Sequence, residues 1–205
     1  MRATAAVCLV MLVLPIGLKS VFGHGFLFDN TEAVNGCSDT SEWTAENKAE
    51  VLSLLKEENW KTLGVKEKMA VLATVKNIEI NYLGIDHEIY IEADELEMGV
   101  AGMYNPRFRT LTIDIRHLEN GSAAECLNTV LHECYHAYQY MMASMYLDLP
   151  ENYRNMHMFR MAEIYAKELD NYNDGRQDTE GYYAQNVESE ARSYAYDAAG
   201  RYMET

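Results

Sequence analysis

Hydrophobic residues recur every three to four positions in two segments of the N-terminal half, a spacing that predicts amphipathic helices. The first segment covers residues 44–60 and the second covers residues 65–82, with Gly84 just after it as a typical helix end. The apolar positions are Val51, Leu54 and Leu55 in the first segment and Met69, Leu72, Val75, Ile78 and Tyr82 in the second. We therefore expect two helices before residue 85.

Between residues 89 and 115 apolar and polar residues alternate, which predicts β-strands. The three strand-like runs are residues 89–92, 100–104 and 110–115. The sequence Asn105-Pro106-Arg107 separates the last two runs and is typical of a turn. These runs predict a small antiparallel or mixed sheet.

Helical spacing returns after Asn120, where Ser122 and Glu125 have the spacing of a capping box. Pro150 and the sequence Asn173-Asp174-Gly175 interrupt the helical pattern. The predicted helices cover about residues 122–146, 151–172 and 183–202. Without internal repeats or a long linker, the pattern indicates one α+β domain over residues 24–205, mostly helical, with its small sheet preceding the helix of residues 122–146.

The first 23 residues have the features of a secretory signal. Arg2 precedes a nearly unbroken apolar run over residues 5–14, and Pro15 and Gly17 then interrupt it. The run is shorter than the roughly 20 residues of a spanning helix. We expect cleavage near Gly23 and a secreted or extracytoplasmic protein, with an uncleaved membrane anchor as the alternative.

The charge balance narrows the set of partners. The chain has 205 residues, with 17 Lys and Arg against 32 Asp and Glu, for a formal net charge of -15. Nucleic-acid binding needs clustered basic residues to neutralise phosphates, and anionic lipid attracts basic segments. We therefore expect no nucleic-acid partner and no membrane partner after signal cleavage.

Cysteine use allows at most one internal disulfide in the mature chain. Cys8 lies inside the predicted signal, which leaves Cys37, Cys126 and Cys134. Cys37 could pair with either of the other two. The three have no zinc-ribbon spacing, and Cys134 is expected to fill the core as a small hydrophobe.

Residues 132–136 read His-Glu-Cys-Tyr-His and carry the chemistry of the chain. On a helix, positions i and i+4 share one face, so His132 and His136 can bind one metal ion. Glu133 lies beside that point and can act as a general base on a water. This HExxH arrangement predicts a zinc site with one Zn²⁺ ion, although two ordinary histidines and a solvated glutamate would give the same letters.

A catalytic zinc site usually has three protein ligands, so a third is needed. In the last predicted helix, Glu188 lies at the edge of an apolar stripe, where a carboxylate is costly unless it is paired or bound to metal. Glu188 is therefore the predicted third ligand, with Glu190 as the second choice. The competing interpretation of Glu188 is a surface ion pair with Arg192 at i+4.

The segments His132-Glu-Cys-Tyr-His-Ala-Tyr-Gln139 and Tyr182-Tyr-Ala-Gln-Asn-Val-Glu-Ser-Glu-Ala191 resemble zincin-like metallopeptidases of the gluzincin type. They are most similar to a group of small bacterial proteins with HExxHxxQ and a later helix carrying Glu-x-[Asp/Glu]-Ala. The resemblance covers roughly residues 89–201 and implies a zincin-like fold. It departs at Arg192, where the gluzincin pattern has an aspartate.

These observations predict a secreted zinc metallopeptidase that acts on protein or peptide substrates, with Glu133 as general base. Tyr182, Tyr183 and His157 are candidates to donate a hydrogen bond to the oxyanion, because they lie near or between the ligand segments. The alternative is a secreted binding or scaffold protein on the same frame, with a structural metal or none.

Overall fold

The computed structural model describes residues 8–11 and 45–203. The signal peptide predicted for residues 1–23 lies outside these residues except for β1 (Cys8–Met11), and Cys37 lies outside them entirely. Both predictions therefore stay predictions. Within the described residues, no helix is both long and apolar enough to cross a membrane.

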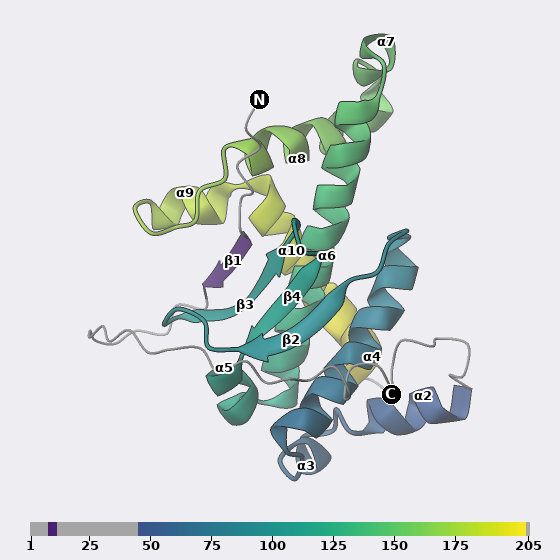
Figure 1. The fold of residues 1–205 in the computed structure, drawn as a ribbon, viewed down its shortest axis with the longest axis vertical. Helices are drawn as coiled ribbons and strands as arrows, with labels where there is room; N and C mark the ends of the chain where they lie inside the picture. The colour runs from purple at the N-terminus through teal and green to yellow at the C-terminus, as the bar shows by residue number, and fades with distance from the viewer. Residues whose placement is uncertain (1–7, 12–44, 204–205) are drawn as a thin grey trace.

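Helices dominate the described part of the chain, and the strands lie together in one sheet (Figure 1). The strands after β1 are β2 (Tyr90–Asp94), β3 (Val100–Asn105) and β4 (Thr110–Asp114). The helices are α2 (Ala45–Ser53), α3 (Glu57–Trp60), α4 (Val65–Leu83), α5 (Ile115–Asn120), α6 (Ala123–Asp148), α7 (Glu151–Arg154), η2 (His157–Phe159), α8 (Arg160–Asp170), α9 (Thr179–Ala184) and α10 (Asn186–Met203). The predicted α+β composition is confirmed.

The sheet is mixed, with the strand order β1-β3-β4-β2. β3 and β4 form an antiparallel hairpin, whose turn is held by Asn105 Oδ1 as it accepts from the amides of Arg107 and Phe108. β2 pairs with β4 in parallel, so it is not the first strand of a simple meander. The result is that β3 lies on the opposite side of β4 from β2.

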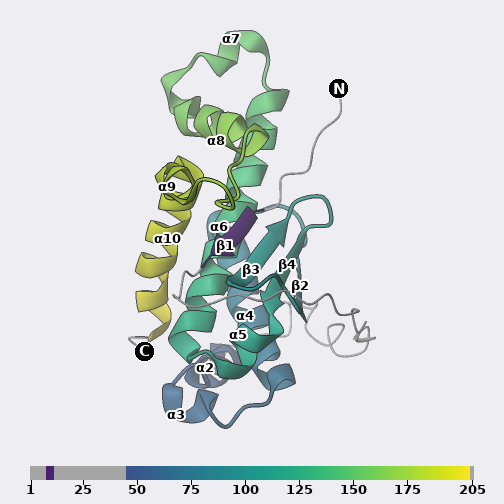
Figure 2. The same cartoon turned by 90° about the vertical axis from the view of Figure 1, so that its left-hand side faces the viewer.

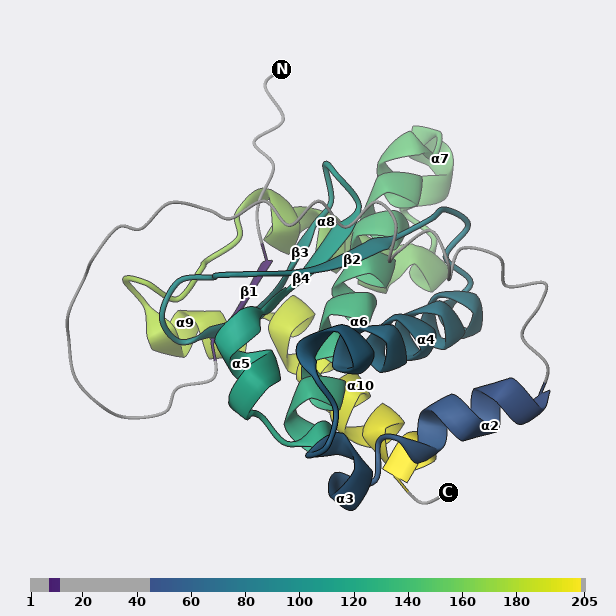
Figure 3. The same ribbon diagram turned by 60° about the horizontal axis from the view of Figure 1, so that its bottom comes forward.

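Helices α4 and α6 pack on the sheet, and α10 lies alongside α6 (Figure 3). The core between these layers is formed by aliphatic side chains that are almost fully buried. They include Leu72, Val75, Leu111, Ile113, Leu127, Val130 and Leu131. The outer end of α6 extends beyond the sheet, and α8 packs back along it after α7 and η2 (Figure 2). Helix α6 therefore contacts the sheet as well as α4, α8 and α10.

Two single helices predicted from periodicity are interrupted in the structure. Residues 44–60 form α2 and α3 with a turn between them, which lets both Leu55 and Trp60 reach the core. The indole Nε1 of Trp60 donates to the carbonyl of Gly121, a contact that local periodicity cannot show. Residues 151–172 are divided into α7, η2 and α8, and no side chain of α7 or η2 is buried.

The other helices begin and end close to the predicted residues. Ser122 caps α6 by accepting from the amide of Glu125, and the Glu125 carboxylate accepts from the amide of Ser122, so the predicted capping box is confirmed. Gly84 ends α4 in the left-handed conformation, with φ of 68°. The short helices α5 and α9 were not predicted, and each has an aspartate, Asp114 or Asp178, as its N-cap.

A buried carboxylate fixes α10 against α4. Glu79 of α4 is 1% exposed and accepts hydrogen bonds from the hydroxyls of Tyr194 and Tyr202 and from the guanidinium of Arg201. All three donors belong to α10. Because α10 also carries Glu188, this network determines where the predicted third ligand lies relative to α6.

Candidate metal site

Helix α6 presents the two motif histidines to each other, as their i, i+4 spacing predicts. The Nε2 atoms of His132 and His136 lie 2.8 Å apart. His132 is 2% exposed and His136 is 0% exposed. Both rings are therefore held inside the protein with the same nitrogen facing one point. Burial and the neighbouring His136 lower the pKa of His132 to about 4, so His132 is neutral at pH 7 and can offer a lone pair.

Glu188 of α10 completes a cluster of three possible metal ligands. Its Oε2 lies 3.5 Å from His132 Nε2 and its Oε1 lies 3.3 Å from His136 Nε2. Burial opposes its ionisation, but the charge and hydrogen bonds of His136 and His132 outweigh burial and hold the pKa of Glu188 well below its usual range. The structure thus brings together His132, His136 and Glu188, with their ligand atoms within 4.8 Å of one another.

These separations fit one tetrahedral ion. Ligand atoms at 2.0–2.1 Å from zinc lie about 3.4 Å from each other in a tetrahedron. The His–Glu distances of 3.5 and 3.3 Å are close to this value, but they involve Oε2 and Oε1 respectively, so one oxygen would have to turn toward both histidines. The two imidazole nitrogens, at 2.8 Å, would move apart by about half an ångström. Two imidazoles and one carboxylate form a donor set typical of a catalytic zinc, with a fourth position left for water or substrate.

Side chains behind the ligands orient them. The Nδ1 atom of His136 lies 2.8 Å from Oε1 of Gln139, and the amide of Gln139 donates to the carbonyl of Val187 at 2.9 Å. The hydroxyls of Tyr172 and Tyr182 each donate to one oxygen of Glu188 at 2.6 Å. Such contacts fix the tautomer and the direction of a metal ligand.

Glu133 lies in the same buried region but has no such contacts. It is 0% exposed, and neither of its carboxylate oxygens has a hydrogen-bond partner among the described residues. Burial raises its pKa to about 8. His136 and the backbone amide of Tyr104, which approaches the carboxylate without reaching hydrogen-bond geometry, offset only part of this. A buried, unpartnered carboxylate is costly, which marks Glu133 as a functional candidate.

Strand β3 runs directly against this part of α6. A Cβ atom at Gly102 would lie 2.5 Å from Thr129 Cγ2 and 3.4 Å from Glu133 Cγ. The first distance is shorter than any van der Waals contact allows, so glycine is the residue that permits this approach. The sheet therefore passes beside the candidate base itself.

The remaining candidates from the sequence lie in three different environments. Tyr182 is buried against Glu188, and Tyr183 is 39% exposed and holds its carbonyl toward Arg192. His157 lies in η2, beyond the outer end of α6, and none of its described contacts is with the cluster. Glu190, the second choice for third ligand, instead accepts from the hydroxyl of Tyr165.

Cys126 and Cys134 are not part of the site. Cys126 and Cys134 are free thiols, and both are fully buried. Burial raises the pKa of Cys126 to about 12 and raises that of Cys134 as well, so both thiols stay protonated. The prediction that Cys134 fills the core is confirmed.

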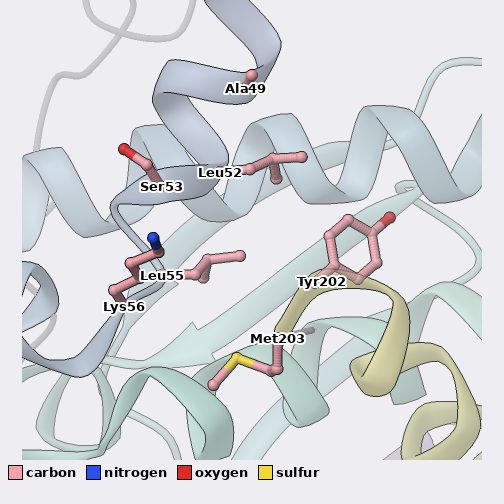
Figure 4. A pocket seen from close by; sticks show the side chains of 7 residues that line it. All are labelled: Ala49, Leu52, Ser53, Leu55, Lys56, Tyr202 and Met203. Carbon is pink, nitrogen blue, oxygen red and sulfur yellow. The ribbon is translucent and has the colours of Figure 1, made fainter. Parts of the chain in front are cut away.

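A separate pocket lies between α2 and the C-terminal end of α10 (Figure 4). It has a volume of about 230 Å³ and is lined by Ala49, Leu52, Ser53, Leu55, Lys56, Tyr202 and Met203. Tyr202 follows Glu188 by fourteen residues of one helix, which is about 20 Å at 1.5 Å per residue. This pocket is therefore remote from the histidine cluster.

Gln139 and Tyr172 are site residues that sequence reasoning missed. Gln139 is part of the HExxHxxQ pattern, and its position three residues after His136 was the available signal. Tyr172 is one of fifteen tyrosines, and nothing in the local sequence distinguishes it.

Comparisons with known proteins do not add to this geometry. No protein-family profile matches the chain, and no curated protein or solved structure matches it. A function for this chain is therefore proposed from the arrangement of its own residues.

Proposed function

We propose that this chain is a zinc-dependent peptidase of the zincin-like, gluzincin type, secreted after removal of an N-terminal signal. The observation that carries the proposal is the buried cluster of His132, His136 and Glu188 with the unpartnered carboxylate of Glu133 beside it. A metal site alone needs only the first three residues. Glu133 adds a carboxylate that can accept and deliver a proton.

The donor set favours zinc, because two imidazole nitrogens and one carboxylate oxygen are the ligands of many catalytic zinc sites. Zinc bound there supplies Lewis-acid chemistry, lowering the pKa of a water and polarising the substrate carbonyl. His132 and His136 hold it through Nε2, and Glu188 holds it through a carboxylate oxygen. Gln139 keeps the His136 ring oriented through Nδ1.

Glu133 acts as the general base of the proposed reaction. One of its carboxylate oxygens accepts the proton of the attacking water, and the same group then delivers that proton to the leaving amine nitrogen. Its pKa of about 8 without metal comes mainly from burial, and a bound divalent cation would favour the ionised form that the base requires.

Tyr182 is the candidate oxyanion donor that lies nearest the ligands. Its hydroxyl donates its one proton to Glu188 Oε2 at 2.6 Å, and burial, Glu188 and Glu133 raise its pKa, so the hydroxyl stays protonated. To donate to the oxyanion it would have to turn away from Glu188. Tyr183 is the alternative on the exposed side of the same segment.

The competing function is a secreted binding or scaffold protein with a structural metal. The observation in its favour is that all three ligands are at most 2% exposed. Structural zinc sites, however, normally have four protein ligands, whereas the described residues bring three together. A structural site also has no use for a buried base, so Glu133 distinguishes the two functions.

The test combines metal analysis with hydrolysis of a mixed peptide library by the mature protein. We expect one zinc per chain, cleavage that stops on chelation, and no cleavage by Glu133→Gln, which should keep its zinc. Glu163→Gln, an exposed glutamate of α8, is the matched control and should cleave normally. Undiminished cleavage by the Glu133→Gln variant would overturn the proposal, as would equal zinc content in His132→Ala and Glu188→Ala variants and the parent.

A further inference from the structure

Arg192 connects the buried cluster to solvent. It follows Glu188 by one turn of α10, and its Nη1 lies 3.5 Å from Glu188 Oε2. Its Nη2 donates to the carbonyl of Tyr183 at 2.7 Å, and its guanidinium lies 4.8 Å from the centre of the Tyr183 ring. These contacts hold the guanidinium in one place, while 35% of the side chain stays exposed.

The contact with Glu188 does not by itself explain this arginine. Both oxygens of Glu188 already accept short hydrogen bonds from Tyr172 and Tyr182, each at 2.6 Å. At 3.5 Å, the Arg192 contact is an ion pair at the outer limit of a hydrogen bond, so it leaves most of the N–H donors of Arg192 unused. A guanidinium has five N–H donors, and the described contacts use two of them, so three remain for a partner from solvent.

The charge balance of the site indicates what that partner is. A divalent ion with the carboxylates of Glu188 and Glu133 is neutral, and Arg192 then leaves one net positive charge on the exposed side. In a chain with a net charge of -15, a fixed cation at this point is a local exception. Its planar, bidentate donor geometry matches a carboxylate.

We propose that Arg192 binds a carboxylate of the substrate adjacent to the scissile peptide bond, an inference that rests on the proposed peptidase function. An ion held by Glu188 Oε2 at about 2.0–2.2 Å would lie within about 6 Å of Arg192 Nη1. Successive residues of a peptide are 3.8 Å apart, so the guanidinium can reach the residue that follows the scissile bond. That carboxylate is either the free C-terminus or an acidic side chain.

The test measures binding in a Glu133→Gln background, so that no peptide is consumed. Zinc-loaded protein is titrated calorimetrically with one short peptide in two pairs of forms. The first pair has a C-terminal acid or a C-terminal amide, and the second has aspartate or asparagine at the residue after the expected scissile bond. We expect one carboxylate form to bind about 10-fold to 100-fold more tightly than its neutral counterpart.

Adding Arg192→Gln should abolish that preference, and Arg192→Lys should keep part of it, because a lysine retains the charge but not the bidentate geometry. Arg160→Gln, at the exposed start of α8, is the control and should leave the preference unchanged. Zinc content is measured in each variant. If Arg192→Gln loses zinc, Arg192→Lys serves as the test, and its preference for the carboxylate form should be smaller than that of the parent.

Equal affinity for the charged and neutral forms, or a preference that survives both Arg192 substitutions, would overturn the role of Arg192. Failure of this inference is distinct from failure of the proposed function. A parent protein that cleaves peptides without carboxylate preference contradicts only the inference, whereas a parent that cleaves none contradicts the function.

Discussion

The Nδ1 atom of His136 lies 2.8 Å from Oε1 of Gln139, one turn farther along α6, and Gln139 in turn donates to the backbone of α10 at Val187. This one side chain therefore orients a predicted ligand on α6 and attaches the helix that carries the third ligand. Gln139 is 0% exposed, and both its oxygen and its nitrogen have hydrogen-bond partners, as a buried amide requires.

Replacing Gln139 should weaken zinc binding without removing a ligand. In Gln139→Leu, Nδ1 of His136 loses its contact with Gln139 and the Val187 carbonyl loses the bond from the Gln139 amide, so we expect zinc affinity to fall about 10-fold to 100-fold. Competition with a chelating dye measures this value. Gln185→Leu, a glutamine of the neighbouring loop that bonds Asn173, is the control. Unchanged affinity in Gln139→Leu would show that the contact does not support the ligand.

Glu133→Gln should stabilise the metal-free protein while abolishing hydrolysis. With a pKa of about 8 in the folded protein and about 4.5 in the unfolded chain, Glu133 must take up a proton on folding at pH 7, and it stays buried without hydrogen-bond partners. A neutral amide of the same size removes that cost. We expect the free energy of unfolding at pH 7 to rise by about 1–3 kcal/mol, measured by urea denaturation in the presence of a chelator. A less stable Glu133→Gln variant would contradict the environment assigned to this side chain.

The same carboxylate predicts a pH dependence. Its pKa is raised to about 8 in the folded protein, so the unfolded chain ionises first, from about 4.5 upward. Between these two pKa values the folded protein keeps Glu133 protonated while the unfolded chain has lost the proton. The contribution of Glu133 to stability therefore falls as the pH rises. The metal-free parent should therefore lose stability between pH 6.5 and 8, and the Glu133→Gln variant should not. Parallel profiles for the two proteins would contradict the raised pKa.

Acid should destabilise the metal-free protein through His132. Its pKa is lowered to about 4, mainly by burial, against 6.5 in the unfolded chain. The unfolded state therefore takes up the proton first, and the contribution of His132 to stability falls as the pH falls from 6.5 to 4. The Glu133→Gln variant removes the opposing effect of Glu133, and His117, whose pKa burial also lowers, acts in the same direction as His132. We expect the midpoint of this variant in urea to decrease steadily over that range, and a midpoint that stays constant would contradict the assignment.

Glu79→Ala should loosen α10. The substitution leaves the hydroxyls of Tyr194 and Tyr202 and the guanidinium of Arg201 without their shared acceptor. Loss of this shared acceptor costs about 1–3 kcal/mol for each buried donor that is left unsatisfied, so a decrease in thermal midpoint is expected. Zinc affinity should also fall, because α10 carries Glu188. The exposed Glu163→Ala is the control, and a Glu79→Ala protein as stable as this control would exclude the network as a support for α10.

The sequence predicts the local parts of this site well, because they depend on helix geometry. The spacing of His132 and His136 places them on one face wherever the helix lies, and the stripe on the last helix selects Glu188 over Glu190. The structure agrees, since Glu188 joins the cluster and Glu190 bonds Tyr165.

Long-range contacts explain what the sequence could not predict. After the turn between α2 and α3, Trp60 bonds Gly121, sixty-one residues away, a contact that local periodicity does not contain. The parallel pairing of β2 with β4 has no local signal either, because any of the three alternating runs can be the central strand. Tyr172 reaches Glu188 through the chain reversal between α8 and α10, and tyrosine patterns do not encode that reversal.

The central claim is that one zinc ion is held between α6 and α10, and anomalous diffraction from a crystal grown with zinc tests it directly. Data collected on both sides of the zinc absorption edge should give one strong peak, about 2.0–2.2 Å from His132 Nε2, His136 Nε2 and a carboxylate oxygen of Glu188. A zinc-loaded crystal with no anomalous peak between these three side chains would contradict the account.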